Sequence, residues 1–194
     1  MHDLKEFIEL IGYPGIFAII FAESCLIFFL PGDTLLFTAG LLASQNLFSL
    51  PILLIGCFIA AVLGNNAGYF FGKKFGRNLF ENPNSKIFKK KHLELTEEYY
   101  NKHGAKTIVL ARFMPIIRTF APVVAGIALM NYKTFFIYNL VGALLWAIGV
   151  TVLGYFLGTV LPDPDKFLLP IVGLIFIASL APALIHWWQE KKKS

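Results

Sequence analysis

The sequence predicts an all-α integral membrane protein, in which an inverted repeat contains two re-entrant broken-helix hairpins. Three observations lead to this fold class. The 194 residues are 57% hydrophobic and only 15% charged, whereas a soluble domain is about 45–50% apolar and about 25% charged. The mean hydropathy is +0.67. Some apolar segments are long enough to span a bilayer, and others are interrupted by proline and charge. We therefore expect a single membrane domain over residues 1–194.

Three uninterrupted apolar segments predict three full transmembrane helices. A spanning helix needs about 20 mostly apolar residues. Residues 51–72, 135–158 and 167–188 meet this requirement. The last segment ends at Trp187 and Trp188, directly before a lysine-rich tail, and this order is typical of a membrane-interface anchor.

Two further apolar segments, 16–43 and 107–130, are broken near their middle. The first contains Pro31-Gly32-Asp33, and the second contains Pro115 and Pro122. Proline removes a backbone donor and interrupts a helix. Broken helices at membrane depth are tolerated where protein or a water-filled cavity surrounds them. Both segments are therefore predicted to be re-entrant hairpins that enter and leave the bilayer on the same side.

The distribution of basic residues predicts the orientation. Residues 73–91 carry seven Lys or Arg and one Glu, and the tail carries Lys191–Lys193. Such segments remain in the cytoplasm, so the C-terminus is expected there and no nucleic-acid partner is needed. The loop 161–165 is acidic and is expected outside, as is the N-terminus. Within the cytoplasmic linker 74–105, residues 87–103 are amphipathic and predict a surface helix, or alternatively a solvated one.

An internal repeat appears when the sequence is shifted by 86 residues. The repeat halves are 14–73 and 106–160. The matching positions are Ala39-Gly40 with Ala125-Gly126, Gly56 with Gly142, Gly68-Tyr69-Phe70 with Gly154-Tyr155-Phe156, and Gly72 with Gly158. The charge pattern places one hairpin outside and the other inside, so the repeat is inverted. Inverted repeats are typical of secondary transporters with a binding site near the bilayer midplane.

Four ionisable residues lie in the two hairpins: Glu23 and Asp33 in the first, Arg112 and Arg118 in the second. Each costs roughly 2.5–3.5 kcal/mol at a helix centre. Pairing between the hairpin tips is the economical arrangement. The arginines could bind an anion such as phosphate, since guanidinium matches phosphate oxygens in pairs. The acids could accept protons. Alternatively, all four charges could form salt bridges with a purely structural role.

Six more residues are candidates for lining a cavity, although helix packing would also explain each of them: Asn65, Asn66, Tyr69, Asn139, Trp146 and Tyr155. The four histidines fall outside the membrane segments or at their edges and lack the spacing of metal ligands. We therefore expect no metal, no cofactor and no catalytic residue. A phosphatase would require a nucleophile or general acid, typically histidine.

The run from Ala111 to Met130, ARFMPIIRTFAPVVAGIALM, resembles the signature of the DedA family of bacterial membrane proteins, which carry a VTT/SNARE-associated-like domain. Glu23 followed by Pro31-Gly32-Asp33 is similar to the acidic first hairpin of that family. The Gly-Tyr motifs at 68 and 154 fit as well, and the resemblance covers residues 14–160. One departure is Asn65, where many members carry Asp.

The resemblance implies a transporter in the bacterial cytoplasmic (inner) membrane with several membrane passes. Its expected cargo is a phosphate-headed lipid, undecaprenyl phosphate or phosphatidylethanolamine, and its expected driving force is the proton gradient. The arginines and acids of the hairpins are the functional positions of the family. The expected partners are the lipid and protons. Whether the chain forms a homo-oligomer is left undecided by the sequence. The alternatives are a small-ion or proton exchanger and a structural membrane assembly factor.

Overall fold

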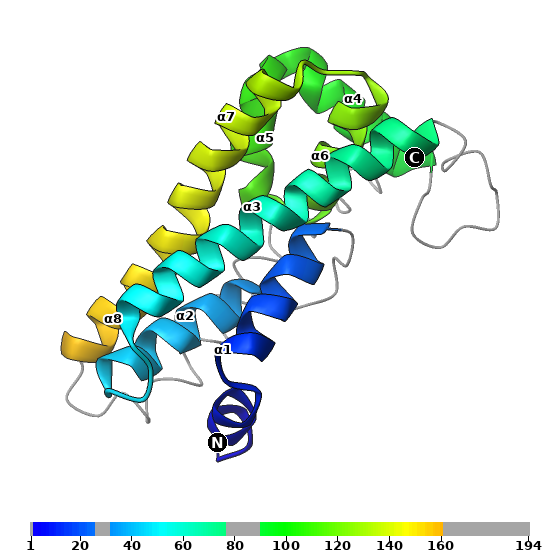
Figure 1. Cartoon of the computed structure of the whole chain (residues 1–194). Coiled ribbons are helices and arrows are strands. Elements are labelled where there is room, and N and C mark those ends of the chain that lie inside the picture. Colours follow the sequence, from blue (N-terminus) through cyan, green and yellow to red (C-terminus); the bar gives the residue numbers. More distant parts are fainter. Residues whose placement is uncertain (1, 26–31, 77–89, 161–194) are drawn as a thin grey trace, which may run out of the picture.

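The computed structural model describes residues 2–25, 32–76 and 90–160, and every regular element in these ranges is a helix (Figure 1). The expected all-α class is therefore confirmed for this part of the chain. Several expectations fall outside the described residues: the bend at Pro31, the first part of the basic linker, the acidic loop, the span 167–188 and the lysine tail.

Two long apolar helices cross the molecule in opposite directions. Helix α3 covers Leu50–Phe75, and a continuous helix from Tyr132 to Val160 contains α7 and α8. At 1.5 Å per residue these helices are about 39 Å and about 43 Å long, which exceeds the roughly 30 Å hydrocarbon core of a bilayer. The predicted spans 51–72 and 135–158 lie inside them, and both are apolar enough to cross a membrane.

Apolar side chains on the two long helices face outward. On α3, Ile52, Ile55 and Leu63 are at least half exposed, and Leu144, Leu153 and Phe156 are equally exposed on the other helix. A soluble protein hides such stripes in its core, whereas a helix in lipid presents them to its solvent. The outward stripes are therefore suited to contact with lipid.

The second long helix has an interruption that the sequence did not predict. Helix α7 covers Tyr132–Ala143 and α8 covers Gly149–Val160, and one π-helical turn, Leu144–Ile148, joins them. Helix α7 begins after Asn131, whose side chain accepts from the backbone amides of Lys133 and Thr134. π-Helical turns inside α-helices occur frequently at functional sites.

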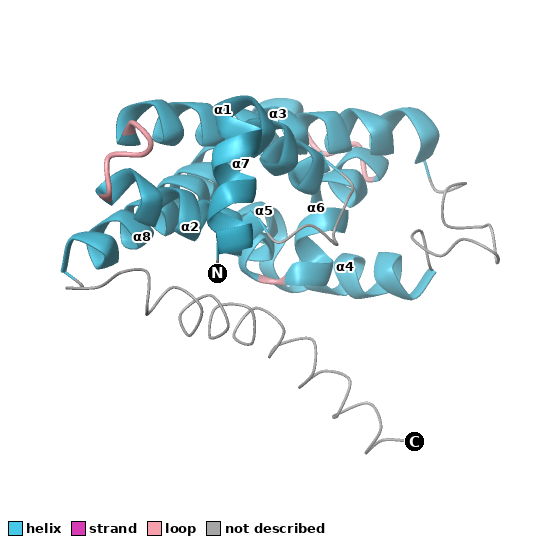
Figure 2. Cartoon of the chain, turned by 90° about the horizontal axis from the view of Figure 1, so that it is seen from below, coloured by secondary structure: helices cyan, strands magenta, loops and turns pink. Residues whose placement is uncertain are grey.

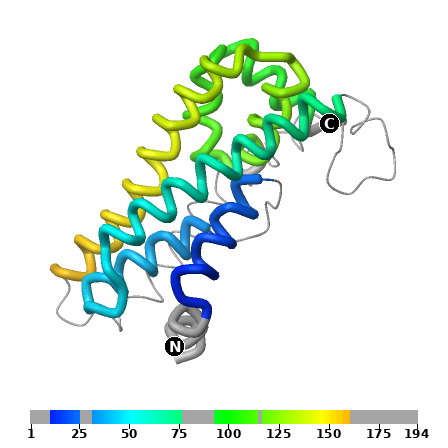
Figure 3. The backbone as a smooth tube through the Cα atoms, in the orientation of Figure 1, coloured from blue at the N-terminus to red at the C-terminus, as the bar shows by residue number. Residues whose placement is uncertain are grey.

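The first hairpin consists of α1 (His2–Cys25) and α2 (Gly32–Ser44). Helix α1 is kinked at Gly12, which has a φ of +55°. Its second half runs beside α3 in the same direction. Likewise, α2 runs beside α8 in the same direction as α8. Because α3 and α8 point in opposite directions, α1 and α2 do so as well. Helices α1 and α2 are therefore antiparallel (Figure 3).

The second hairpin breaks where Pro115 predicted a break. Helix α5 (Thr107–Leu110) and a 3₁₀ turn (Ala111–Phe113) precede Met114, which is extended, and α6 (Pro115–Ile127) follows. An extended residue before proline is the expected geometry. Pro122, by contrast, does not break the helix, since α6 continues through it and packs along α3. Entry of either hairpin into a bilayer from one side stays a prediction.

The repeated glycines mark two equivalent helix contacts. A Cβ on Gly40 of α2 would overlap the backbone of Thr151 in α8, and a Cβ on Gly126 of α6 would overlap the backbone of Tyr69 in α3. Each short hairpin helix therefore lies against the long helix of the other repeat half, with the two contacts offset by one helical turn. The glycines permit this close approach, as small residues do between membrane helices.

Helix α4 (Lys90–His103) covers the outer side of the second hairpin (Figure 2). The hydroxyl of Tyr100 donates to the carbonyl of Ala121 in α6 at 3.0 Å. Burial raises the pKa of this Tyr100 hydroxyl. The amphipathic segment predicted at 87–103 is thus helical over its described residues, and one face packs on protein. Its position at a membrane surface stays a prediction.

Candidate functional site

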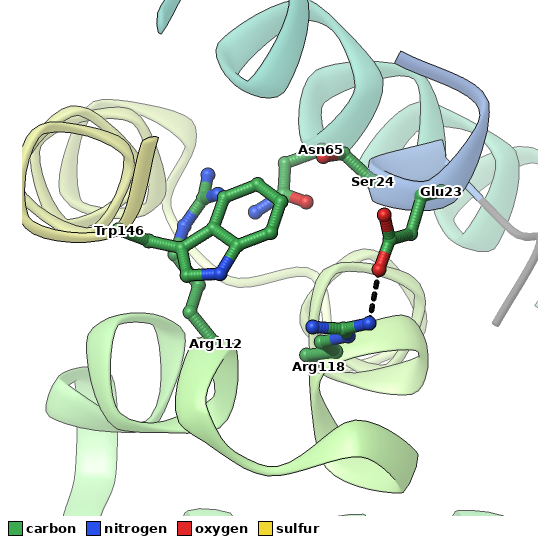
Figure 4. Close-up of a pocket in the computed structure, with 6 residues that line it drawn as sticks. All are labelled: Glu23, Ser24, Asn65, Arg112, Arg118 and Trp146. Carbon is green, nitrogen blue, oxygen red and sulfur yellow. Dashed lines mark hydrogen bonds and ion pairs between the residues drawn. The ribbon is translucent and has the colours of Figure 1, made fainter. Parts of the chain in front are cut away.

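The end of α1 and the start of α2 meet the break of the second hairpin in the middle of the molecule, between α3 and the π-helical turn. A small cavity of about 10 Å³ lies at the meeting point. It is lined by Glu23, Ser24, Asn65, Arg112, Arg118 and Trp146 (Figure 4). A volume of this size holds roughly one water molecule. Five of the six lining residues are among those that the sequence singled out, and Ser24 is the exception.

Arg118 binds both acids of the first hairpin. Its Nη1 donates to Oδ2 of Asp33 at 2.8 Å, and its Nη2 donates to Oε1 of Glu23. The side chain of Glu23 is 1% exposed and that of Asp33 is 22% exposed, so the pairs are largely shielded from water. Charge-assisted hydrogen bonds of this kind are about twice as strong as neutral ones. One guanidinium therefore joins residues 95 and 85 positions away along the chain.

Trp146 connects the acids with both arginines. Its Nε1 donates to Oδ1 of Asp33 at 2.5 Å. The guanidinium carbons of Arg112 and Arg118 lie 5.7 Å and 5.8 Å from its ring centroid, within cation–π range. The residue sits in the π-helical turn, one residue-width of extra backbone in an otherwise regular helix. This turn thus positions the indole at the hairpin tips.

Arg112 is buried without a counter-ion. Only 5% of the residue is exposed, and within the described part of the chain its guanidinium forms no ion pair. Its Nη2 donates to Oδ1 of Asn139 at 2.7 Å, and its Nε has no partner in the structure. The expected pairing of two acids with two arginines therefore occurs on Arg118 alone.

Two carboxamides surround Arg112. Asn139 donates from Nδ2 to the carbonyl of Val62 at 3.1 Å, which fixes its orientation. In one orientation Asn65 donates from Nδ2 to Oδ1 of Asn139 at 3.1 Å. With its amide flipped, its nitrogen instead donates to the Ser24 carbonyl at 2.9 Å and its oxygen accepts from Arg112 at 3.0 Å. Neutral groups thus meet most of the hydrogen-bonding needs of Arg112 and leave its charge uncompensated.

Three of the six additional candidates lie away from the cavity. Asn66 faces outward and accepts from the hydroxyl of Tyr132 at 3.4 Å. Tyr69 stacks on Phe135 with ring centroids 4.5 Å apart, and its hydroxyl donates to the carbonyl of Met130. Tyr155 packs against the apolar core near α2. Helix packing accounts for these three, which was the alternative explanation offered for them.

Two groups at the site were missed by sequence reasoning. Ser24 contributes its backbone carbonyl to Asn65, and Val62 contributes its carbonyl to Asn139. Backbone carbonyls carry no mark in the sequence. For Ser24, its position beside Glu23 in an apolar helix was the available signal.

The cavity between the hairpins holds about one water molecule, which is less space than a phosphate group occupies. The Arg118 ion pairs with Glu23 and Asp33 join the two hairpins beside this cavity. Among the described residues, no cluster of three or more His, Cys, Asp or Glu side chains could hold a metal ion.

Comparison with known proteins supports the same conclusion about family. Residues 30–156 match the VTT domain. Protein DedA of Escherichia coli (strain K12) is 47% identical over 184 residues, which cover 93% of this chain and 84% of that protein. An uncharacterized membrane protein of Mycobacterium leprae (strain TN) is 43% identical over 176 residues, covering 90% of this chain and 79% of that one.

A more distant relative is also a membrane protein. Inner membrane protein YqjA of Escherichia coli (strain K12) is 32% identical over 190 residues, covering 92% of this chain and 85% of that protein. No solved structure matches the chain significantly. The matched region contains α2, α3, the second hairpin and the second long helix as far as residue 156, with the site residues from Asp33 to Trp146. Glu23 and Ser24 precede it. The chain therefore belongs to the DedA family of membrane proteins, which carry the VTT domain.

Proposed function

We propose that this protein moves a phosphate-headed lipid, undecaprenyl phosphate or phosphatidylethanolamine, across the cytoplasmic membrane in a proton-linked manner. The observation that carries this proposal is the guanidinium of Arg112, which has no counter-ion among the described residues and lies beside a paired cluster of opposite charges. A buried charge without a partner is costly, several kcal/mol even after relaxation. A protein that retains such a charge gains from it when an anion arrives.

Arg112 and Arg118 would bind the phosphate group together. Both guanidinium carbons lie less than 6 Å from the same indole ring, so both groups border the same small volume. The planar fork of arginine suits paired hydrogen bonds to phosphate oxygens. Among the described residues, Arg112 has no carboxylate to release, whereas Arg118 must release Glu23 and Asp33 before it binds an anion.

Release of the Arg118 carboxylates provides the proton link. Protonation of both Glu23 and Asp33 removes the negative charges that hold Arg118, and the freed guanidinium then turns to phosphate. Deprotonation on the other side of the membrane restores the ion pairs and expels the anion. Each turnover would therefore exchange a bound lipid headgroup for a proton-sensitive ion pair.

A lipid cargo agrees with the exposed apolar stripes on α3 and on α7 and α8. In this proposal both long helices span the membrane, the hairpins are re-entrant, and the headgroup reaches the cavity from the lipid side. The C-terminus lies in the cytoplasm. The chemistry is non-covalent, since binding and ion-pair exchange require neither a nucleophile nor a general acid.

Reconstitution into vesicles tests the proposal. Labelled undecaprenyl phosphate or phosphatidylethanolamine is placed in one leaflet, and its appearance in the other is followed with and without a pH gradient. We expect faster movement with wild-type protein than in empty vesicles, and a loss of that gain with Arg112→Gln. Failure of wild-type protein to move either lipid would contradict the proposal.

A small-ion or proton exchanger is the second candidate, and the cavity volume favours it. Room for about one water molecule admits a proton or a small ion without any opening of the hairpins. In the same vesicles an exchanger would dissipate an ion gradient while leaving both lipids in place. This outcome would replace the lipid proposal, whereas lipid movement that depends on Arg112 would exclude the exchanger.

A further inference from the structure

The charge of Arg112 is not neutralised by its hydrogen-bond acceptor, because that acceptor is the amide of Asn139. We propose that Asn139 is a positioning residue, which fixes the Arg112 guanidinium for phosphate binding without neutralising its charge. This inference rests on the proposed binding of a phosphate group by Arg112. It adds a role for a side chain that does not itself line the cavity.

Asn139 is fully buried and uses both ends of its amide. Its Oδ1 accepts from Nη2 of Arg112 at 2.7 Å, and its Nδ2 donates to the carbonyl of Val62 at 3.1 Å. A flip of the amide would bring donor against donor at Arg112 and acceptor against acceptor at Val62. The carbonyl of α3 therefore fixes the amide, and the amide fixes the guanidinium.

Gly142 completes the support, one turn further along α7. A Cβ at this position would lie 2.8 Å from Nε and 2.9 Å from Cδ of Arg112. The absence of a side chain leaves room for the arginine to lie along α7 toward Asn139. The position of Arg112 is thus set from two sides by the same helix, by a hydrogen bond and by a missing side chain.

The choice of amide over carboxylate determines what Arg112 can bind. Aspartate has nearly the same shape as asparagine, and at 2.7 Å it would form a permanent ion pair with Arg112. A phosphate group would then have to displace a carboxylate that is covalently fixed in place. Asparagine supplies the same acceptor oxygen without the charge, so the guanidinium is held and remains attractive to an anion.

Three variants separate position from charge. Asn139→Asp keeps an acceptor for Arg112 and cancels its charge, although it also loses the donor to the Val62 carbonyl. Asn139→Ala removes both the acceptor and the donor and leaves the charge of Arg112. Asn66→Asp is the matched control, because it introduces the same carboxylate on α3 next to Asn65 while facing away from the cavity toward Tyr132. Each variant is purified in detergent, and its fold is checked by circular dichroism and thermal unfolding.

The measurement is binding of undecaprenyl phosphate, phosphatidylethanolamine and inorganic phosphate by wild-type protein and each variant. A hydrogen bond to a charged group is worth about 1.5–3 kcal/mol, roughly tenfold or more in affinity. We expect Asn139→Ala to weaken binding by this factor, Asn139→Asp to weaken it at least as much, and Asn66→Asp to match wild type. Inorganic phosphate that binds like the lipids identifies the phosphate group itself as the ligand, and lipid binding alone shows that the acyl or prenyl chain also contributes.

The outcomes separate the positioning role of Asn139 from the proposed function. A folded Asn139→Asp protein that binds as wild type overturns the positioning role and leaves the proposed function intact. Binding lost equally in Asn66→Asp also overturns it, because a carboxylate anywhere at this depth would then suffice. Wild-type protein that binds none of the three probes overturns the proposed function and this inference with it.

Discussion

Removal of the Arg118 guanidinium should destabilise the protein more than removal of either acid. In Arg118→Met, the carboxylates of Glu23 and Asp33 lose the guanidinium that binds both of them, although their side chains are just 1% and 22% exposed. In Glu23→Gln, by contrast, Oε1 still accepts from Arg118, and Asp33 still balances its charge. The two substitutions therefore differ in whether a buried charge is stranded.

The magnitude follows from the burial of the stranded charges. Removal of one partner of a buried ion pair costs about 3–5 kcal/mol. Asp33 keeps a hydrogen bond from Trp146 and some exposure, so the lower value applies, about 3 kcal/mol. For a chain of this size 1 kcal/mol shifts Tm by roughly 2–4 °C, which gives a decrease of about 6–12 °C. Glu23→Gln should cost about 1 kcal/mol, since it loses the ionic part of one hydrogen bond.

A double variant isolates the coupling. Arg118→Met combined with Glu23→Gln strands one charge fewer, so it should be more stable than Arg118→Met alone by about 1–3 kcal/mol. The assay is thermal unfolding of purified protein in detergent, with the exposed Lys73→Met as a control for loss of one positive charge. Equal Tm values for Arg118→Met and Lys73→Met would refute the reasoning, as would a double variant no more stable than Arg118→Met.

Three further predictions concern packing, the indole and the proton link. Gly126→Ala should lower the free energy of unfolding by about 1–3 kcal/mol, because the new Cβ would overlap α3. Gly149→Ala should leave it unchanged, because its Cβ meets open space, and equal Tm values for the two variants would contradict this prediction. Trp146→Phe should lower it by about 1–3 kcal/mol, because Asp33 loses a hydrogen bond, and a Tm unchanged from wild type would show that this bond contributes nothing. Glu23→Gln mimics the protonated acid and leaves Asp33 as the remaining carboxylate on Arg118, so lipid movement by this variant in vesicles should depend less on pH than in wild type. A pH dependence identical to wild type would remove Glu23 from the proton link.

The positions of the long helices could be predicted from the sequence because hydropathy reports the solvent directly. The spans expected at 51–72 and 135–158 lie within α3 and within the α7–α8 helix. The break at Pro115 was predictable as well, since proline acts on its own local backbone. Pro122 was not a reliable breaker, because packing of α6 on α3 holds the helix together across it.

The partners of each charge were harder to predict. The sequence indicated that acids from one hairpin meet arginines from the other, and Arg118 does bind both acids. That Arg112 would contact Asn139 instead depends on the rotation of α7 about its axis and on the missing side chain at Gly142. The π-helical turn beneath Trp146 was equally hidden, since no residue type specifies it.

The internal repeat was also only partly interpretable from the sequence. Glycines separated by 86 residues indicated two related halves. They did not indicate that each short helix packs on the long helix of the other half, as Gly40 does on α8 and Gly126 on α3. Small residues show that two helices approach closely, but the identity of the partner depends on the tertiary fold.

Binding of a phosphate group by Arg112 is tested most sharply with undecaprenyl phosphate and phosphatidylethanolamine, whose affinities are measured for purified wild-type protein and for Arg112→Gln. Glutamine keeps a polar side chain at this position but carries no charge, and Lys73→Gln is the matched control at an exposed site. We expect wild type and Lys73→Gln to bind one of the lipids equally, and folded Arg112→Gln to bind it at least about tenfold more weakly. Equal binding by Arg112→Gln would show that the unpaired guanidinium is not the phosphate site.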